Sequence, residues 1–150
     1  MSGRIIHSDL LQPGEDRSPK RIGVIGSINR DTIARPDGVV SQGLGGVLYT
    51  VLALAHLSDF GLCPFCKIGK DTAEAVRQLF ETCPQIDQRG VQVVAVDNFH
   101  SQITYYPDGS KKEILAGAPK SFVMGEGDLR PHLQDLDALL INFITGFEID

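Results

Sequence analysis

The sequence has 150 residues, of which 42% are hydrophobic and 22% are charged, as expected for one globular domain with a sizeable core. The formal net charge of −5, with lysines and arginines scattered along the chain, argues against a nucleic-acid partner. No apolar segment is long enough to span a membrane, residues 1–20 lack the features of a secretory signal, and the cysteines number three. A cytoplasmic protein without disulfides is therefore expected.

Strand and helix patterns alternate along most of the chain. Residues 1–20 mix prolines and charges and are expected to form a flexible leader. Short continuous apolar runs predict buried parallel strands at 22–26, 62–68, 91–96 and 138–143. Between them the sequence predicts a helix over 47–55 that is apolar on nearly every face, a helix capped by Asp71 and Glu74 that ends before Pro84, and a short helix capped by Asp128.

Two further segments do not belong to this alternation. Pro36-Asp37-Gly38 and Pro107-Asp108-Gly109 each separate two strand-like runs, which is typical of a hairpin with a tight turn. The hairpins are expected near 31–42 and 101–116, in a small β layer of their own. The sequence thus predicts an α/β fold with a parallel sheet flanked by helices.

Polar residues follow the first predicted strand at its carboxyl end, where open α/β sheets bind ligands. Asn29 and Asp31 are two positions apart on an extended segment, so their side chains point the same way. A carboxylate can accept hydrogen bonds from two adjacent hydroxyl groups. Gly45 and Gly46 begin the apolar helix, where bare amide groups could face a ligand. These four residues predict a site for a small polar ligand; alternatively, they are only turn residues.

From about Arg21 to Asp150 the sequence resembles the N-terminal half of a ribokinase-like (PfkB-family) carbohydrate kinase. The matching pieces occur in family order. They are the first-strand motif 26–31, the double glycine Gly45-Gly46 followed by Thr50 and Ala53, the strand end 68–71, Gly90-Val91, the second hairpin, Ala116-Gly117-Ala118 and the turn 142–148.

This resemblance implies a Rossmann-like three-layer sandwich in which 21–150 form the N-terminal substrate-binding part and the two hairpins form a lid. It implies that a small sugar, polyol or nucleoside binds to Asn29, Asp31, Gly45, Gly46 and Thr50. Thr50 stands where the family has an asparagine. ATP and Mg²⁺ are the implied cofactors, and a homodimer through the lid strands is a further hypothesis.

No Gly-Ala-Gly-Asp segment occurs in the chain, and in the family this segment supplies the catalytic base and an anion hole. The C-terminal half with the ATP site is therefore expected to be absent from these 150 residues, and the chain alone is expected to be inactive.

Two alternatives stay open. The first is a non-catalytic sugar-binding or regulatory module. The second is a thiol redox protein using Cys63 and Cys66, although two thiols three positions apart on a strand should point to opposite faces. Cys83 and His56 would be needed to complete a zinc site with this pair.

Overall fold

The computed structural model describes residues 20–144, 146 and 148–150 and contains two four-stranded sheets. The predicted leader thus lies outside the described residues, apart from Lys20. The main sheet is parallel in the order β5-β4-β1-β8, with β1 Arg21–Ile25, β4 Gly61–Gly69, β5 Val91–Val94 and β8 Ala138–Ile141. The second sheet, here called the hairpin sheet, has the order β3-β2-β6-β7, with β2 Arg30–Ala34, β3 Val40–Leu44, β6 His100–Tyr105 and β7 Lys111–Ala116.

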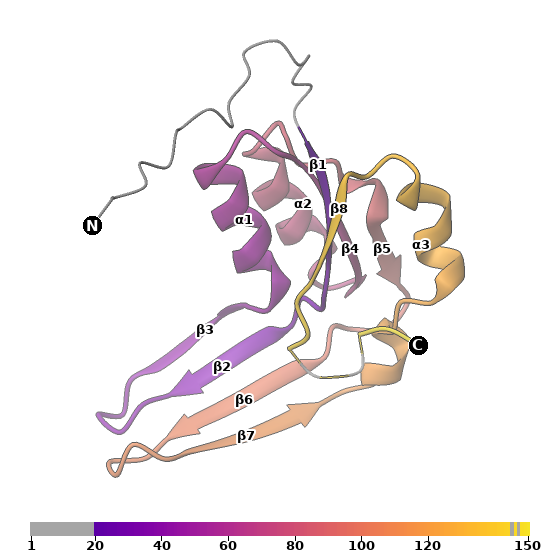
Figure 1. Cartoon of the computed structure of the whole chain (residues 1–150). Helices are drawn as coiled ribbons and strands as arrows, with labels where there is room; N and C mark the ends of the chain where they lie inside the picture. Colours follow the sequence, from indigo (N-terminus) through magenta and orange to yellow (C-terminus); the bar gives the residue numbers. More distant parts are fainter. Residues whose placement is uncertain (1–19, 145, 147) are drawn as a thin grey trace, which may run out of the picture.

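Helices cover both faces of the main sheet (Figure 1). α1 (Val47–Leu57) and α2 (Ala73–Glu81) pack on one face, and α3 (Glu126–Leu133) lies on the other. Alternation along β4 explains this arrangement, because Leu62, Cys66 and Ile68 join the core cluster beneath α1 and α2. Phe65 belongs to a second cluster on the opposite face, with Leu129 of α3 packed against it. The predicted three-layer α/β fold is confirmed.

Helix α1 differs from its prediction. Val47, Leu48, Val51 and Ala55 are buried, whereas Leu57 is 84% exposed and other apolar positions are only partly covered. The expectation of a helix buried on every face is therefore wrong. A helix that lies on one face of a sheet can bury only the stripe that contacts the sheet.

Several predicted boundaries also shift. Strands β5 and β8 each end two residues earlier than their apolar runs suggest.

The two predicted helix caps have different outcomes. Asp71 was expected to cap α2, but Thr72 occupies the N-cap position. Asp71 instead accepts a hydrogen bond from the Asn98 amide at 2.7 Å. Asp128 does cap α3, because its carboxylate accepts from the Gly125 amide at 2.9 Å.

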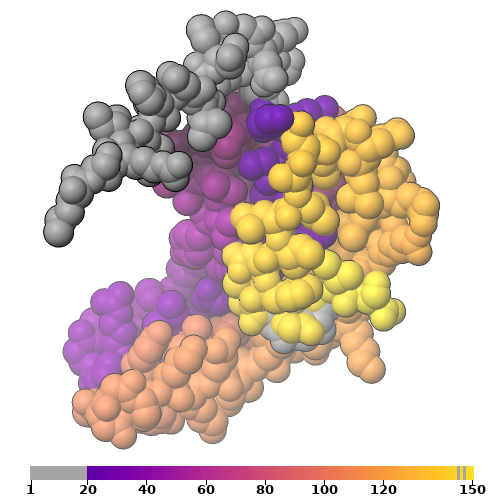
Figure 2. All heavy atoms as spheres, in the orientation of Figure 1, coloured from indigo at the N-terminus to yellow at the C-terminus, as the bar shows by residue number. Residues whose placement is uncertain are grey.

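The hairpin sheet extends from the carboxyl edge of the main sheet, and Figure 2 shows the two hairpins projecting beyond the body of the molecule. Both turns place their glycine, Gly38 or Gly109, at a φ of 82°, a conformation that few other residues adopt. The two hairpins join through parallel pairing of β2 with β6. None of the helices in the described part of the chain is long and apolar enough to cross a membrane.

Candidate functional site

The candidate site lies where the main sheet meets the hairpin sheet. Strand β1 ends at Ile25, and the following segment carries the buried residues Ser27 and Asn29 into β2. Strand β3 returns antiparallel to β2, so that Asp31 lies opposite Gly43. The chain then passes through Gly45 and Gly46 into α1. This short return path brings the polar strand end and the glycines together.

The side chains of Asn29 and Asp31 lie directly against the two glycines. Asn29 donates a hydrogen bond from Nδ2 to Oδ1 of Asp31. A methyl group at Gly45 would overlap with Oδ2 of Asp31, and one at Gly46 would overlap with the Ser27 carbonyl oxygen and lie 2.8 Å from Oδ1 of Asn29. Gly46 also has a φ of 71°, which favours glycine. The structure therefore brings four of the five predicted site residues into one cluster.

One polar atom in this cluster lacks a partner. Asn29 is 5% exposed, and its Oδ1 has no hydrogen-bond partner among the residues that the structure describes. Leaving a buried acceptor unpaired costs about 1–3 kcal/mol, and buried polar atoms normally have a partner. A ligand hydroxyl that donates to this oxygen would remove the cost. This atom thus identifies the cluster as a candidate ligand site.

Burial raises the pKa of Asp31 above its usual value, and the negative charge of Glu113 raises it further, whereas His100 opposes the shift. Partial desolvation also strengthens any hydrogen bond that the ionised carboxylate makes. The arrangement suits a carboxylate that receives hydroxyl hydrogens from a small polar molecule.

The Gly45 amide plays a different part from the one predicted. The Gly45 amide donates to the Asn29 carbonyl at 2.8 Å, and the Val47 amide donates to the Ser27 carbonyl at 2.9 Å. The helix start is therefore not a bare set of donors, because the strand end already occupies two of these groups. The absence of side chains at Gly45 and Gly46 instead lets Asp31 and Asn29 approach the helix closely.

Thr50, the fifth predicted residue, lies in the first turns of α1. Its Oγ1 accepts a hydrogen bond from Nδ2 of Asn142 at 2.7 Å, which links it to the segment after β8. Next to this contact, the buried Glu148 accepts from Ser27 Oγ at 3.0 Å and from the Ile144 amide at 2.7 Å. The segment after β8 thereby joins the segment after β1 at the carboxyl edge of the main sheet.

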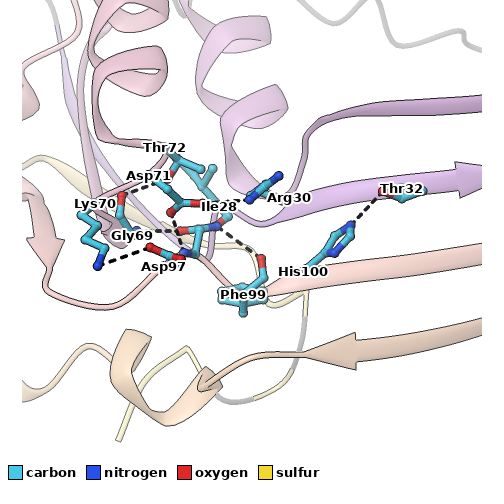
Figure 3. Close-up of polar contacts among 11 residues, drawn as sticks. Ile28, Arg30, Thr32, Gly69, Lys70, Asp71, Thr72, Asp97, Phe99 and His100 are labelled. Atoms are coloured by element: carbon cyan, nitrogen blue, oxygen red, sulfur yellow. Dashed lines mark hydrogen bonds and ion pairs between the residues drawn. The ribbon is translucent and has the colours of Figure 1, made fainter.

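Buried Asn98 supports the site from the other side. Its Nδ2 donates to the Ile28 carbonyl at 2.8 Å, and its Oδ1 accepts from the Gly69 amide at 2.7 Å. Arg30 forms an ion pair with Asp71 at 2.9 Å (Figure 3). These contacts tie the start of β2 to the end of β4 and so fix the position of Asp31. Asn98 could not be identified from the sequence, since its role depends on three segments that are distant along the chain.

The hairpin sheet also adds residues that the sequence analysis missed. Ser101 is paired with Asp31 across β2 and β6, and its hydroxyl donates to Oε1 of Glu113 on β7 at 2.7 Å. Alternation within the second hairpin could have placed Ser101 and Glu113 on one face. Only the pairing of β2 with β6 shows that Asp31 shares that face.

A cavity of about 250 Å³ borders the same strands. Its polar side chains include Arg30, Thr32 and His100, and Thr32 contacts His100 at 2.8 Å (Figure 3). These residues alternate with Asp31 and Ser101 along β2 and β6, so they project from the opposite face of the hairpin sheet. Asp31 nevertheless belongs to the lining of the cavity, which therefore adjoins the candidate site.

The structure does not bring Cys63 and Cys66 together. They belong to the two core clusters on opposite faces of the main sheet, as expected from their spacing. Burial raises the pKa of the Cys66 thiol to about 12, which opposes formation of a reactive thiolate. Cys83 lies 3.7 Å from Nδ1 of His56, but the described residues contain no group of three or more possible metal ligands among their His, Cys, Asp and Glu side chains.

Comparison with known proteins relates this architecture to kinases. No protein-family model and no curated protein sequence matches the chain. Among solved structures, ribokinase from Cryptococcus neoformans matches 83% of this chain with a TM-score of 0.64 and 16% identity. A Burkholderia thailandensis nucleoside kinase in complex with inosine matches 85% (TM-score 0.63, 11% identity), and ribokinase from Giardia lamblia matches 89% (TM-score 0.61, 18% identity).

These matches cover only 42%, 46% and 43% of the three kinase chains, respectively. At such low identity the likeness concerns the fold and leaves the activity open. The chain therefore has a ribokinase-like α/β fold and spans less than half the length of the solved kinases that share it.

Proposed function

We propose that this chain is the substrate-binding part of an ATP-dependent kinase that phosphorylates a hydroxyl group of a small sugar, polyol or nucleoside. The observation that carries the proposal is the buried Oδ1 of Asn29, which lies beside the Asp31 carboxylate and has no partner among the described residues. Together they offer several acceptor positions to adjacent hydroxyl groups. The similar folds of ribokinases and of a nucleoside kinase bound to inosine support the same class of substrate.

Each proposed residue has a separate part in binding. Asp31 accepts from hydroxyl groups of the substrate, and Asn29 accepts from a further hydroxyl through Oδ1. Gly45 and Gly46 give these two side chains room beside α1. Thr50 contributes a hydroxyl that Asn142 already orients. These hydrogen bonds restrict the side chains of Thr50, Asn29 and Asp31, which lowers the entropy cost of binding.

ATP and Mg²⁺, which the resemblance implies, are proposed to bind outside the described residues. The start of α1 uses the Gly45 and Val47 amides internally, and α2 has the acidic Glu74 in its first turn, which disfavours a phosphate there. The nucleotide site and the catalytic base are therefore proposed to lie in further sequence that pairs with β8.

Strand β8 supports this part of the proposal. It is an edge strand of the main sheet, and its large apolar side chains are between 39% and 47% exposed. An open edge of this kind is suited to pairing with another strand. In vitro, we expect the 150-residue chain to bind substrate without turnover; sugar-dependent ATP hydrolysis by this chain would contradict that expectation.

A non-catalytic sugar-binding or regulatory module remains the second candidate. A homodimer through the hairpin sheet is also proposed, since β3 and β7 are edge strands and expose Val40 and Ile114. Sedimentation at tens of micromolar protein tests the dimer, and a monomer would exclude it.

A cytoplasmic location remains a prediction that the three free cysteines support.

Isothermal titration calorimetry tests the binding site directly, with D-ribose, D-fructose, ribitol and inosine as probes. At least one probe should bind, and Asp31→Ala should weaken its binding by about tenfold to a hundredfold, because a charged hydrogen bond is worth about 1.5–3 kcal/mol. Asp59→Ala is the matched control, since Asp59 is exposed in the connection between α1 and β4. Equal affinities of the wild type and Asp31→Ala would contradict the proposal that Asp31 binds the substrate.

A further inference from the structure

A second carboxylate shares the face of the hairpin sheet that carries Asp31. Asp31 lies opposite Ser101 in the parallel pair β2–β6, and Ile103 lies opposite Glu113 in the antiparallel pair β6–β7. Because alternate residues of a strand share a face, Glu113 projects on the same side as Asp31. Their strands are separated by β6, and the two residues are offset along the strands by the step from Ser101 to Ile103. Two strand spacings combined with this offset put their backbones about 12 Å apart. A molecule the size of a monosaccharide can reach from one carboxylate towards the other.

Glu113 is held in place although β7 is exposed. The Ser101 hydroxyl, which is almost completely buried, donates to Oε1 of Glu113 at 2.7 Å, and Lys111 Nζ lies 3.4 Å from Oε2. The Ser101 hydrogen bond is the main reason that the pKa of Glu113 lies below its usual value, so Glu113 is ionised at neutral pH. A fixed, ionised carboxylate on this face can therefore contact a ligand without first being ordered.

Asn29 provides an independent indication that a ligand binds beside Asp31. Its Oδ1 is buried and unpartnered within the described part of the chain. A ligand hydroxyl that satisfies this atom would lie at the β2 end of the face, next to Asp31. The rest of the same molecule would then extend across β6 towards Glu113.

We propose that Glu113 is a specificity-determining residue of this site: it accepts hydroxyl or ammonium hydrogens from the end of the substrate that lies away from Asn29, and together with Asp31 it excludes anionic substrates. This inference rests on the proposed function and narrows its substrate class to uncharged or cationic polyhydroxy compounds. Sugar phosphates and sugar acids would bring a negative charge close to two carboxylates, and such juxtaposition of like charges is a strong means of rejecting a ligand.

Calorimetry with paired probes tests the inference: D-ribose against D-ribose 5-phosphate, inosine against inosine 5′-monophosphate, and D-glucose against D-glucosamine. Glu113→Gln has the same shape and can still accept from Ser101, so it removes mainly the charge. Glu81→Gln is the matched control, because Glu81 is exposed at the end of α2. Thermal unfolding of both variants verifies that they are folded.

The wild type should bind the uncharged member of each phosphate pair at least about tenfold more tightly, and Glu113→Gln should reduce this preference about tenfold. The variant should also lose any preference for D-glucosamine over D-glucose. An unchanged preference in Glu113→Gln, with binding that still requires Asp31, would overturn this inference alone. Binding that is independent of Asp31, or no binding of any probe, would overturn the proposed function as well.

Discussion

Asp31 carries its carboxylate directly over the α-carbon of Gly45, so closely that a methyl group on Gly45 would overlap with Oδ2. This relationship connects the end of a buried strand to the start of a helix. It also explains why position 45 is a glycine although its amide already donates to the Asn29 carbonyl. The site depends on a close approach between a side chain and a backbone.

Gly45→Ala should therefore weaken substrate binding without unfolding the protein. Gly45 does not have a positive φ, so alanine fits its backbone conformation, but the new methyl group must displace the Asp31 carboxylate. We expect at least about a tenfold loss of affinity in calorimetry. Gly43→Ala is the control, because a methyl group at Gly43 has no neighbour within 4 Å. Equal affinities of the two variants would show that the Asp31–Gly45 contact does not matter for binding.

Gly46→Ala should instead destabilise the fold. A residue with a side chain is strained at a φ of 71°, and its methyl group would overlap with the Ser27 carbonyl oxygen. Because a backbone atom cannot move aside easily, we expect a loss of about 2–4 kcal/mol in the free energy of unfolding. Urea denaturation monitored by circular dichroism measures this loss. A variant as stable as Gly43→Ala would be inconsistent with the geometry at Ser27.

Asp31→Asn should stabilise the protein at neutral pH while weakening substrate binding. Desolvation is the main cause of the raised pKa of Asp31, so ionising this group is less favourable in the folded state than in the unfolded state. The protonated carboxyl therefore favours the folded state relative to the ionised carboxylate. This stabilisation is fully present below the usual pKa of 3.8 and is lost as the pH rises through the raised pKa of the folded state.

The stability advantage of Asp31→Asn over the wild type should therefore be present at pH 7 and should shrink as the pH falls towards 3.8. Binding should respond in the same range, since protonation of Asp31 in the wild type removes the charged acceptor. Urea unfolding and calorimetry measure both effects between about pH 3.5, just below the ordinary carboxyl pKa of about 3.9, and about pH 7.5, where an ordinary carboxyl is ionised. A variant that is less stable than the wild type throughout this range would contradict this explanation of the pKa.

Asp128→Asn should have the opposite pH dependence. Lys67 donates a hydrogen bond to Asp128 at 2.8 Å, and with the Gly125 amide and Gln92 it lowers the pKa of this carboxyl to about 2. The stabilisation is therefore complete above the usual value of 3.8 and disappears as the pH falls through about 2. We expect Asp128→Asn to lose about 1–2 kcal/mol of stability at pH 7.

That loss should almost vanish near pH 2, the lowered pKa of Asp128. Urea unfolding at the two pH values measures it, with Asp59→Asn as an exposed control of the same charge change. An equal loss at both pH values would indicate that Asp128 stabilises α3 by packing rather than by its charge.

Local features made much of the fold predictable from the sequence. The apolar runs of β1 and β4 and the two Pro-Asp-Gly turns require only short-range patterns, and all four elements are present. Asn29 and Asp31 could be paired because they alternate on one segment. The three layers follow from the alternation of strands and helices.

The remaining features depend on contacts between distant segments. The sequence of α1 is apolar on nearly every face, so it does not show which side of the helix packs against the sheet and which side is exposed. Asp71 has the composition of a helix cap, but it contacts Asn98 and Arg30 instead. Glu113 shares a face with Asp31 only because β2 pairs with β6, and parallel pairing of two hairpins leaves no local mark in the sequence.

The central claim, that Asn29 and Asp31 bind a polyhydroxy molecule, can be tested most directly by nuclear magnetic resonance. The side-chain amide signal of Asn29 and the backbone amide signals of Gly45 and Gly46 would be followed during titration with D-ribose, D-fructose, ribitol and inosine. The account predicts saturable shifts of these signals with at least one compound, and their loss in Asp31→Ala. Signals that stay unchanged with all four compounds, while the protein remains folded, would contradict it.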